Sequence, residues 1–177
     1  MYEYKHYPKI NRPRNIRVVI TQKIDGSNGQ IIIQEDGTLT CASRNRVLSL
    51  EDDNHGFARW CTDNEKVLVE FLGPGIHYGE WAGPKINSGE GLTERTFVLF
   101  SWWERNANDG ILVMPSLRYV PKLIETNLED IQANNLIIES LRDLKENGSK
   151  LVPGFMNPEG IVVDINGHKI KYFVEDL

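Results

Sequence analysis

The sequence predicts an α+β fold that is dominated by antiparallel sheet. Short runs of β-branched and aromatic residues alternate with Gly, Asn, Asp and Pro along most of the 177 residues, which is typical of strands joined by tight turns. Only one segment, residues 128–146, has a long helical pattern. Because strands outnumber helices, we expect one or two helices to pack on a mainly antiparallel sheet.

The first strand is predicted at residues 16–21, a short run rich in Val and Ile. It would place Lys23 at its carboxyl end, and Gly26 would then permit a sharp turn. A hairpin follows, with strands at residues 30–34 and 38–43, because Glu35-Asp36-Gly37 between them is typical of a turn. The return strand leads into two cations, Arg44 and Arg46, near the lysine.

The middle of the chain combines helix and strand patterns. Residues 54–71 predict an amphipathic helix that is interrupted near residues 62–64. A strand is expected at residues 76–81, and a buried strand at residues 96–103 after a loop rich in Gly, Ser and Asn. A second hairpin is expected through residues 106–110.

The last third contains the predicted helix and a final hairpin. Pro115 and Pro121 bound a strand or loop, after which Thr126 or Asn127 is expected to cap the helix that begins at Leu128. Two strands, at residues 159–164 and 168–173, are joined by Asn166-Gly167, a strong hairpin signal.

Composition excludes several classes of protein. Charged residues make up 25% of the chain and hydrophobic ones 40%, with no apolar run long enough to span a bilayer and no secretory signal at the start, so we expect a cytoplasmic protein. Cys41 and Cys61 form no metal-binding spacing. The net charge is −5, but the first 17 residues are locally basic, either as a solvated leader or as a contact for a polyanion.

Several charged residues are placed where they could meet. Lys169 and Lys171 are two positions apart in a predicted strand, so they share one face. Two ammonium groups on one face either lie exposed to solvent or bind an anion between them. Glu80 and Glu159 lie at the ends of otherwise apolar strands, and each taken alone could be a solvated strand end.

Taken in order, six segments resemble the motifs of the covalent nucleotidyltransferases, which comprise ATP-dependent RNA ligases, DNA ligases and mRNA capping enzymes. The segments are K-I-D-G-S-N from Lys23, S-R-N-R from Ser43, Y-G-E-W-A-G from Tyr78, F-V-L-F-S-W-W from Phe97, E-G-I-V-V from Glu159 and K-I-K-Y-F from Lys169. The chain is most similar to the type-2 RNA ligases, in which Ser or Thr and then Asn follow the glycine of the first motif. Asn28 thus favours RNA over DNA.

This resemblance implies an ATP-grasp-like ligase adenylyltransferase fold and a role for each matching residue. Lys23 would form a lysyl-AMP phosphoramidate with ATP, and Lys169 and Lys171 would bind the α-phosphate. Glu159 would hold Mg²⁺ or Mn²⁺, with Asp25 as a second candidate ligand. The remaining nucleotide contacts would come from Gln22, Asn28, Arg44, Glu80 and Phe100, with Trp102 as the alternative aromatic residue.

The chemistry sets a requirement for the lysine. An ordinary lysine, with a pKa of about 10.4, is only about 0.1% neutral near physiological pH, which is too little for an efficient nucleophile. Burial and nearby cations favour the neutral form, whereas a carboxylate such as Asp25 opposes it. We therefore expect Asp25 to be occupied by backbone donors or by metal-bound water when ATP is bound.

Residues 1–177 are predicted to form a single adenylyltransferase domain without a carboxyl-terminal oligonucleotide-binding or RNA-specificity domain, which an accessory subunit could supply. Ser101 departs from the family pattern, where many ligases have aspartate. The predicted substrate is an RNA end with a 5′-phosphate that is sealed to a 3′-hydroxyl. A nick-sealing DNA ligase core, a capping-type guanylyltransferase and a non-catalytic nucleotide- or RNA-binding module remain as alternatives.

Overall fold

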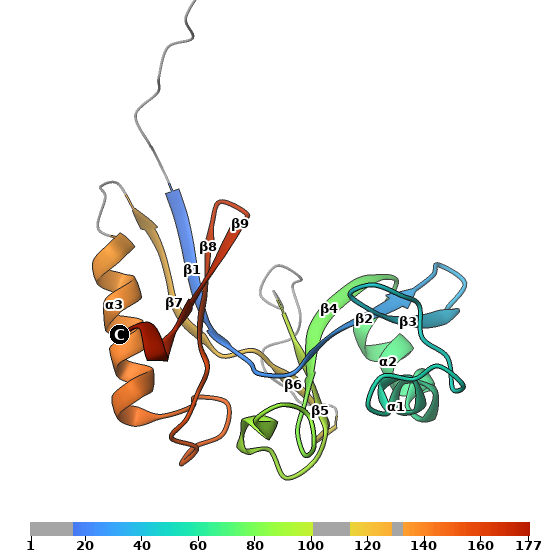
Figure 1. The fold of residues 1–177 in the computed structure, drawn as a ribbon. Coiled ribbons are helices and arrows are strands. Elements are labelled where there is room, and N and C mark those ends of the chain that lie inside the picture. Colours follow the sequence, from blue (N-terminus) through green and yellow to red (C-terminus); the bar gives the residue numbers. More distant parts are fainter. Residues whose placement is uncertain (1–15, 101–113, 129–132) are drawn as a thin grey trace, which may run out of the picture.

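Two mostly antiparallel sheets make up the fold. The computed structural model describes residues 16–100, 114–128 and 133–177, and Figure 1 shows a sheet with its helix on either side of the molecule. The first sheet has four antiparallel strands, in the order β7 (Lys122–Leu128), β1 (Ile16–Lys23), β8 (Gly160–Ile165) and β9 (His168–Phe173). The second has five, in the order β3 (Leu39–Ser43), β2 (Ser27–Ile33), β4 (Gly75–Ala82), β5 (Thr96–Leu99) and β6 (Leu117–Tyr119). In the second sheet only β5 and β6 pair in parallel.

Each sheet buries one face against helix. The helix α3 (Ala133–Asn147) packs on the four-stranded sheet, where Leu144 is fully buried among β1 and β8 residues such as Ile20 and Ile161. The helices α1 (Phe57–Asp63) and α2 (Glu65–Leu72) cover the five-stranded sheet through a separate apolar cluster that includes Phe57, Leu68, Trp81 and Phe97. Within residues 16–100, 114–128 and 133–177, short 3₁₀ turns also occur at Gly89–Gly91 and Val174–Asp176.

Two glycines let the aromatic rings of α1 and β5 lie flat on the second sheet. Gly29 and Gly79 are directly opposite each other in β2 and β4. A Cβ atom at Gly79 would lie 2.5 Å from the ring of Phe97, and one at Gly29 would lie 2.9 Å from that of Phe57. Larger residues here would push the aromatic cluster off the sheet.

The two sheets meet where β1 passes into β2. Ile24 lies in this link and belongs to a third buried cluster with Ala82, Val98, Val120 and Leu151, which come from both halves of the chain. Gly26 is needed in the link for space, because its φ is not positive and a Cβ atom would lie 2.5 Å from the carbonyl oxygen of Trp81. Gly26 thus permits the bend between β1 and β2 because it has no side chain, and not because it adopts a positive φ.

Most predicted elements are confirmed. The interrupted helix is α1 and α2, separated at Asn64, and the first predicted hairpin is β2 and β3 in antiparallel register. In the last hairpin Asn166 and Gly167 have φ values of 49° and 91°, as a two-residue turn of this kind requires. The α+β class with mainly antiparallel sheet is also confirmed. The hairpin predicted through residues 106–110 lies outside the described residues.

The prediction for the start of the long helix is wrong. Thr126 and Asn127, expected as its N-cap, lie in β7, where they pair with Val18 and Arg17 of β1. The helix α3 is described from Ala133 onward. This segment is a strand because it pairs with β1, which lies more than one hundred residues earlier in the sequence. Local helical periodicity gives no information about such a distant partner. Among the described residues, no helix is both long and apolar enough to cross a membrane.

Truncation of Leu144 to Ala is expected to lower the free energy of unfolding by about 2–5 kcal/mol, because it leaves a cavity between α3 and the four-stranded sheet. Ile138 lies on the same helix with 42% of its surface exposed, so Ile138→Ala should change stability by only about 0.5 kcal/mol. Urea unfolding of both variants tests this. Equal losses would show that α3 does not pack as described.

Candidate functional site

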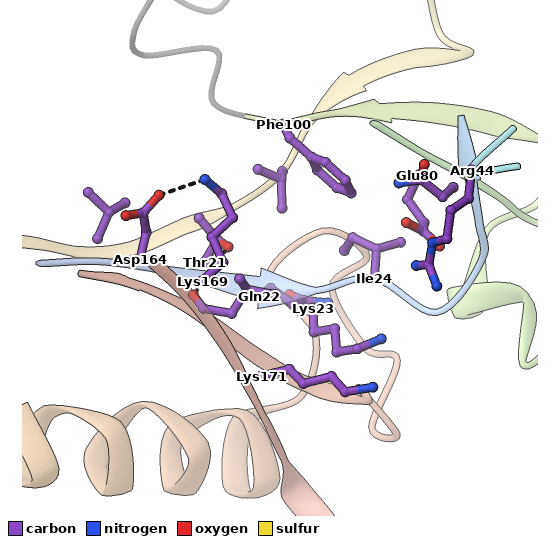
Figure 2. Close-up of a pocket in the computed structure, with 14 residues that line it drawn as sticks. Thr21, Gln22, Lys23, Ile24, Arg44, Glu80, Phe100, Asp164, Lys169 and Lys171 are labelled. Atoms are coloured by element: carbon purple, nitrogen blue, oxygen red, sulfur yellow. Dashed lines mark hydrogen bonds and ion pairs between the residues drawn. The ribbon is translucent and has the colours of Figure 1, made fainter. Parts of the chain in front are cut away.

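A pocket of about 290 Å³ lies between the two sheets, beside the link from β1 to β2 (Figure 2). Its size suits a small organic ligand. One wall carries cations from the four-stranded sheet, and the opposite wall is formed by the five-stranded sheet. The predicted site residues that line it are Gln22, Lys23, Asn28, Arg44, Glu80, Phe100, Lys169 and Lys171. Residues far apart in the sequence are thus brought together, whereas the predicted Asp25 and Glu159 do not line this pocket.

Strand register explains how the cationic wall is built. Lys23 of β1 lies opposite Gly160 of β8, which in turn lies opposite Phe173 of β9. The next row contains Thr21, Val162 and Lys171. Since side chains two residues apart in a strand share a face, both rows lie on one face of the sheet, where Thr21, Lys23 and Lys171 line the pocket.

The Lys23 ammonium group contacts a carboxylate and an aromatic ring. Its Nζ donates to the Glu159 carboxylate at 2.5 Å, and both side chains are only about one-quarter exposed. The same ammonium lies 5.7 Å from the ring centroid of Phe173, and Lys171 Nζ lies 5.2 Å from it, so one ring supports both cations. Gly160 permits this arrangement, because a Cβ atom there would lie 2.1 Å from the Tyr172 carbonyl oxygen.

The two lysines of β9 are not equivalent. Lys169 donates to Asp164 at 2.8 Å, which Figure 2 shows as a dashed line, and its side chain is 55% exposed. The pKa of Asp164 is lowered: burial acts to raise it, but hydrogen bonds from Lys169 and the Gly167 backbone outweigh burial. Lys171 lies beside Lys23 over Phe173 instead. The charge of Lys171 is therefore better placed than that of Lys169 to act at Lys23.

Glu80 faces these cations from β4. Burial raises its pKa to about 7 despite the opposing effects of Lys23 and Arg44, and the negative charges of Glu159 and Asp25 raise it further. The side chain lines the pocket next to Asn28, its direct neighbour across β2 and β4. A carboxyl group that titrates near neutrality can accept hydrogen bonds from ligand hydroxyls when ionised and donate one when protonated.

Asp25 is already supplied with donors. Its carboxylate accepts from the side chain of Asn87 and the backbone N–H of Ser88, each at 3.0 Å. These hydrogen bonds, with the charge of Lys23, lower the pKa of Asp25 against the effect of its burial. The Asp25 backbone N–H donates in turn to the fully buried Glu90. Loop residues 87–90 thus hold the segment that follows Lys23.

Gln22 lines the pocket, but its side chain belongs to a buried network. Its amide nitrogen donates to Glu90 at 2.7 Å and to Ser149 at 2.8 Å, while its amide oxygen accepts from the Lys150 backbone N–H at 2.7 Å. A nucleotide contact from Gln22 would therefore come from its backbone. The Glu90 carboxyl group of this network is fully buried, and burial raises its pKa.

Apolar side chains complete the pocket. Phe100 lies at its upper edge in Figure 2, and Ile24, Val120 and Val162 also line it. A flat aromatic base fits such a surface. Ser101 and Trp102, the departure from the family pattern and the alternative aromatic residue, lie outside the described residues.

The site residues that sequence reasoning missed include Phe173, Thr21, Asp164 and Glu90. Phe173 could have been found, because it continues the alternation of Lys169 and Lys171 on one face of β9. Thr21 likewise precedes Lys23 by two positions. No local pattern marks Glu90, which acts through partners 65 and 68 positions away.

The donor set is compatible with a magnesium-type ion bound together with a triphosphate. Among the described residues no group of three or more His, Cys, Asp or Glu side chains could hold a metal by itself. Mg²⁺, however, is commonly bound by one or two carboxylates plus substrate phosphates and water. Glu159, next to Lys23, suits this role better than Asp25, whose two oxygens already have donors.

The pocket combines a cationic wall, a buried carboxyl group and apolar side chains, and it lies between the two sheets of an α+β fold. The RNA ligase family model matches residues 16–164, and the chain belongs to this family. No curated protein sequence gives a significant match.

Solved structures agree on the fold. A variant of Naegleria gruberi RNA ligase with ATP and Mn has a TM-score of 0.63 and 19% identity, over 92% of this chain and 50% of that one. Another variant, with AMP and Mn, has a TM-score of 0.63 and 19% identity over 92% and 51%. The same ligase with PPi has a TM-score of 0.61 and 19% identity, also over 92% and 51%. The chain thus spans about half the length of that ligase.

The Glu80 carboxyl group should make stability depend on pH. Because its folded-state pKa is raised from 4.5 to about 7, the folded state binds the proton more tightly, and stability falls as pH rises through this window. Glu80→Gln cannot ionise. It should therefore be more stable than the wild type above pH 7, by no more than about 3 kcal/mol, and similar to it below pH 4.5.

Thermal unfolding of both proteins across this range measures the difference. Glu70→Gln, an exposed position on α2, serves as the matched control and should show no such trend. A difference between Glu80→Gln and the wild type that stays constant with pH would contradict the raised pKa.

Proposed function

We propose that this chain is an ATP-dependent RNA ligase that works through a lysyl-AMP intermediate on Lys23. The observation that supports this most strongly is the position of Lys23, at a strand end inside the pocket, with Glu159 at 2.5 Å and Lys171 over the same aromatic ring. Membership of the RNA ligase family supports the choice of RNA as substrate.

In the first step the neutral amine of Lys23 attacks the α-phosphorus of ATP. A P–N bond forms, the bond from the α-phosphorus to the bridging oxygen breaks, and pyrophosphate leaves with the electron pair. The ammonium must first lose its proton, for which the Glu159 carboxylate is the nearest acceptor. Lys171, which lies over the same ring as Lys23, would stabilise negative charge on the transferring phosphate.

The other pocket residues would orient the nucleotide. Phe100 would stack on adenine, while Glu80 and Asn28 would bind the ribose or the reacting RNA end. Arg44 would contact a phosphate or the ribose, and Lys169, paired with Asp164, would bind the triphosphate more weakly than Lys171. Glu159 would hold a divalent cation, which supplies charge neutralisation of the triphosphate when bound. A metal role for Asp25 remains a prediction.

Two further transfers complete the reaction. An oxygen of the RNA 5′-phosphate attacks the phosphorus of lysyl-AMP, so that the P–N bond breaks and a 5′–5′ pyrophosphate forms. The 3′-hydroxyl of the other end then attacks the RNA phosphate, loses its proton and expels AMP. Comparison of sealing at RNA-containing and all-DNA nicks separates this function from that of a DNA ligase core.

Incubation with α-labelled ATP and Mg²⁺ or Mn²⁺ is expected to label the protein through an acid-labile bond. Lys23→Ala and Lys23→Arg should both abolish the label, because neither side chain can provide the nucleophilic amine. Lys66→Ala, which removes an exposed lysine of α2, should be labelled like the wild type. Label that persists on Lys23→Ala would rule out the proposed intermediate.

The two lysines of β9 should differ in their effect on this step. Lys171→Ala should slow label formation by about 10²–10³-fold, the usual cost of losing a group that stabilises transition-state charge. Lys169→Ala should slow it by less than about tenfold, because the Lys169 ammonium is engaged with Asp164. Single-turnover labelling rates of the two variants test this difference. A larger effect at Lys169 would contradict the asymmetry.

A further inference from the structure

The face of the five-stranded sheet that points away from α1 and α2 is exposed beyond the pocket. Along β4, His77, Gly79 and Trp81 are buried, whereas the intervening Tyr78 is 49% exposed. Along β2, Gly29 and Ile31 are buried and the intervening Gln30 is partly exposed. This alternation places Gln30 and Tyr78 on one outward face.

This face continues directly from the nucleotide pocket. Asn28 and Glu80, which line the pocket, form one cross-strand pair of β2 and β4, and Gln30 and Tyr78 form the next pair on the same face. The backbone N–H of Phe100 donates to the Tyr78 carbonyl at 2.8 Å, so the aromatic wall of the pocket is adjacent to Tyr78. A ligand that leaves the pocket along the strands therefore meets the Tyr78 ring.

A second, polar cavity of about 340 Å³ lies beside the cross-strand pair of Asn28 and Glu80. It shares three residues, Asn28, Arg44 and Glu80, with the nucleotide pocket. The rest of its lining is hydroxyl, amide and guanidinium groups together with a glycine, supplied by Gly26, Ser27, Ser43, Asn45, Arg46 and Asn54. Arg46 is paired with Asp52 at 2.9 Å, whereas Arg44 forms no ion pair within the part of the chain that the structure describes, although its charge acts on Glu80. Such a lining suits phosphate and ribose groups.

We infer that Tyr78 is a base-stacking platform for single-stranded RNA. The strand would pass its phosphates and riboses through the polar cavity at Arg44 and place a nearby base on the Tyr78 ring, with the Gln30 amide beside it. Exposed aromatic residues on a sheet are a common means of holding single-stranded RNA without strong sequence preference. This inference rests on the proposed function, since it assigns the RNA path to the site of ligation.

We infer RNA as the ligand of Tyr78 because the exposed sheet face is continuous with the pocket. A protein partner could cover an exposed tyrosine equally well, but it would not explain why the ring adjoins a cavity lined by Arg44, Asn28 and Glu80, which the nucleotide pocket shares. The net charge of the chain is −5, which disfavours nonspecific binding of RNA to the surface as a whole. Binding of RNA would therefore depend on a local site with an aromatic ring and a cation. If a protein docks on Tyr78 instead, removal of the Tyr78 ring should leave the affinity for RNA unchanged.

The test compares affinity for a short, 5′-phosphorylated, fluorescent single-stranded RNA, measured by anisotropy without ATP. Tyr78→Ala should raise the dissociation constant by about 5- to 150-fold, the range for loss of one stacked base. Tyr78→Phe keeps the ring and should bind within about twofold of the wild type. Ile170→Ala, a similarly exposed apolar position (46%) on β9, should also bind normally.

Labelling with α-labelled ATP in the same variants separates this inference from the proposed function. Tyr78→Ala should form lysyl-AMP at the wild-type rate but seal RNA poorly at low RNA concentration. Unchanged RNA affinity in Tyr78→Ala, or an equal loss in Ile170→Ala, would overturn the stacking role. Loss of labelling in Tyr78→Ala would also overturn it, because the ring would then serve the nucleotide. No labelling of the wild type would instead refute the proposed function, while the affinity measurement still decides the role of Tyr78.

Discussion

The register that holds β1, β8 and β9 together is the constraint on which the site depends. It places Lys23, Gly160 and Phe173 in one cross-strand row. A shift of one residue in either pairing would turn Lys171 and Phe173 to the opposite face of the sheet. The α3 side of the sheet resists such a shift, because Ile20, Ile161 and Val163 would then leave the core. Packing on one face of the sheet thus maintains the geometry of the other.

The electrostatics of the pocket show a balance that a bound nucleotide would alter. Lys23 is paired with Glu159 and Lys169 with Asp164, while Glu80 has a pKa of about 7 because it is buried. A triphosphate with its metal would add negative and positive charge close to all of these groups. A bound cation would compete with Lys23 for Glu159, the carboxylate to which the Lys23 Nζ donates.

The segment around Lys23 forms hydrogen bonds with buried residues in addition to its contacts in the pocket. Gln22, directly before it, and Asp25, two positions after it, both connect to Glu90. Gln22 also connects to the loop at Ser149 and Lys150, which follows α3. Buried, fully hydrogen-bonded polar networks of this kind restrict a backbone to one conformation. The lysine is therefore presented by a rigid strand end, although the surrounding elements come from distant parts of the chain.

Local pattern determined much of this protein. The alternation in β9, the Asn166-Gly167 turn and the break at Asn64 are encoded within a few residues, so the strands, the last hairpin and the paired helices could be predicted. Motif order predicted eight of the residues that line the pocket, and their roles toward a nucleotide stay predictions. Tertiary structure decided what depends on distant partners. Thr126 and Asn127 became strand because β1 offered hydrogen bonds, and Gln22 turned inward because Glu90 and Ser149 meet it there. Lys169 pairs with Asp164 because the register of β8 and β9 places these two residues directly opposite each other.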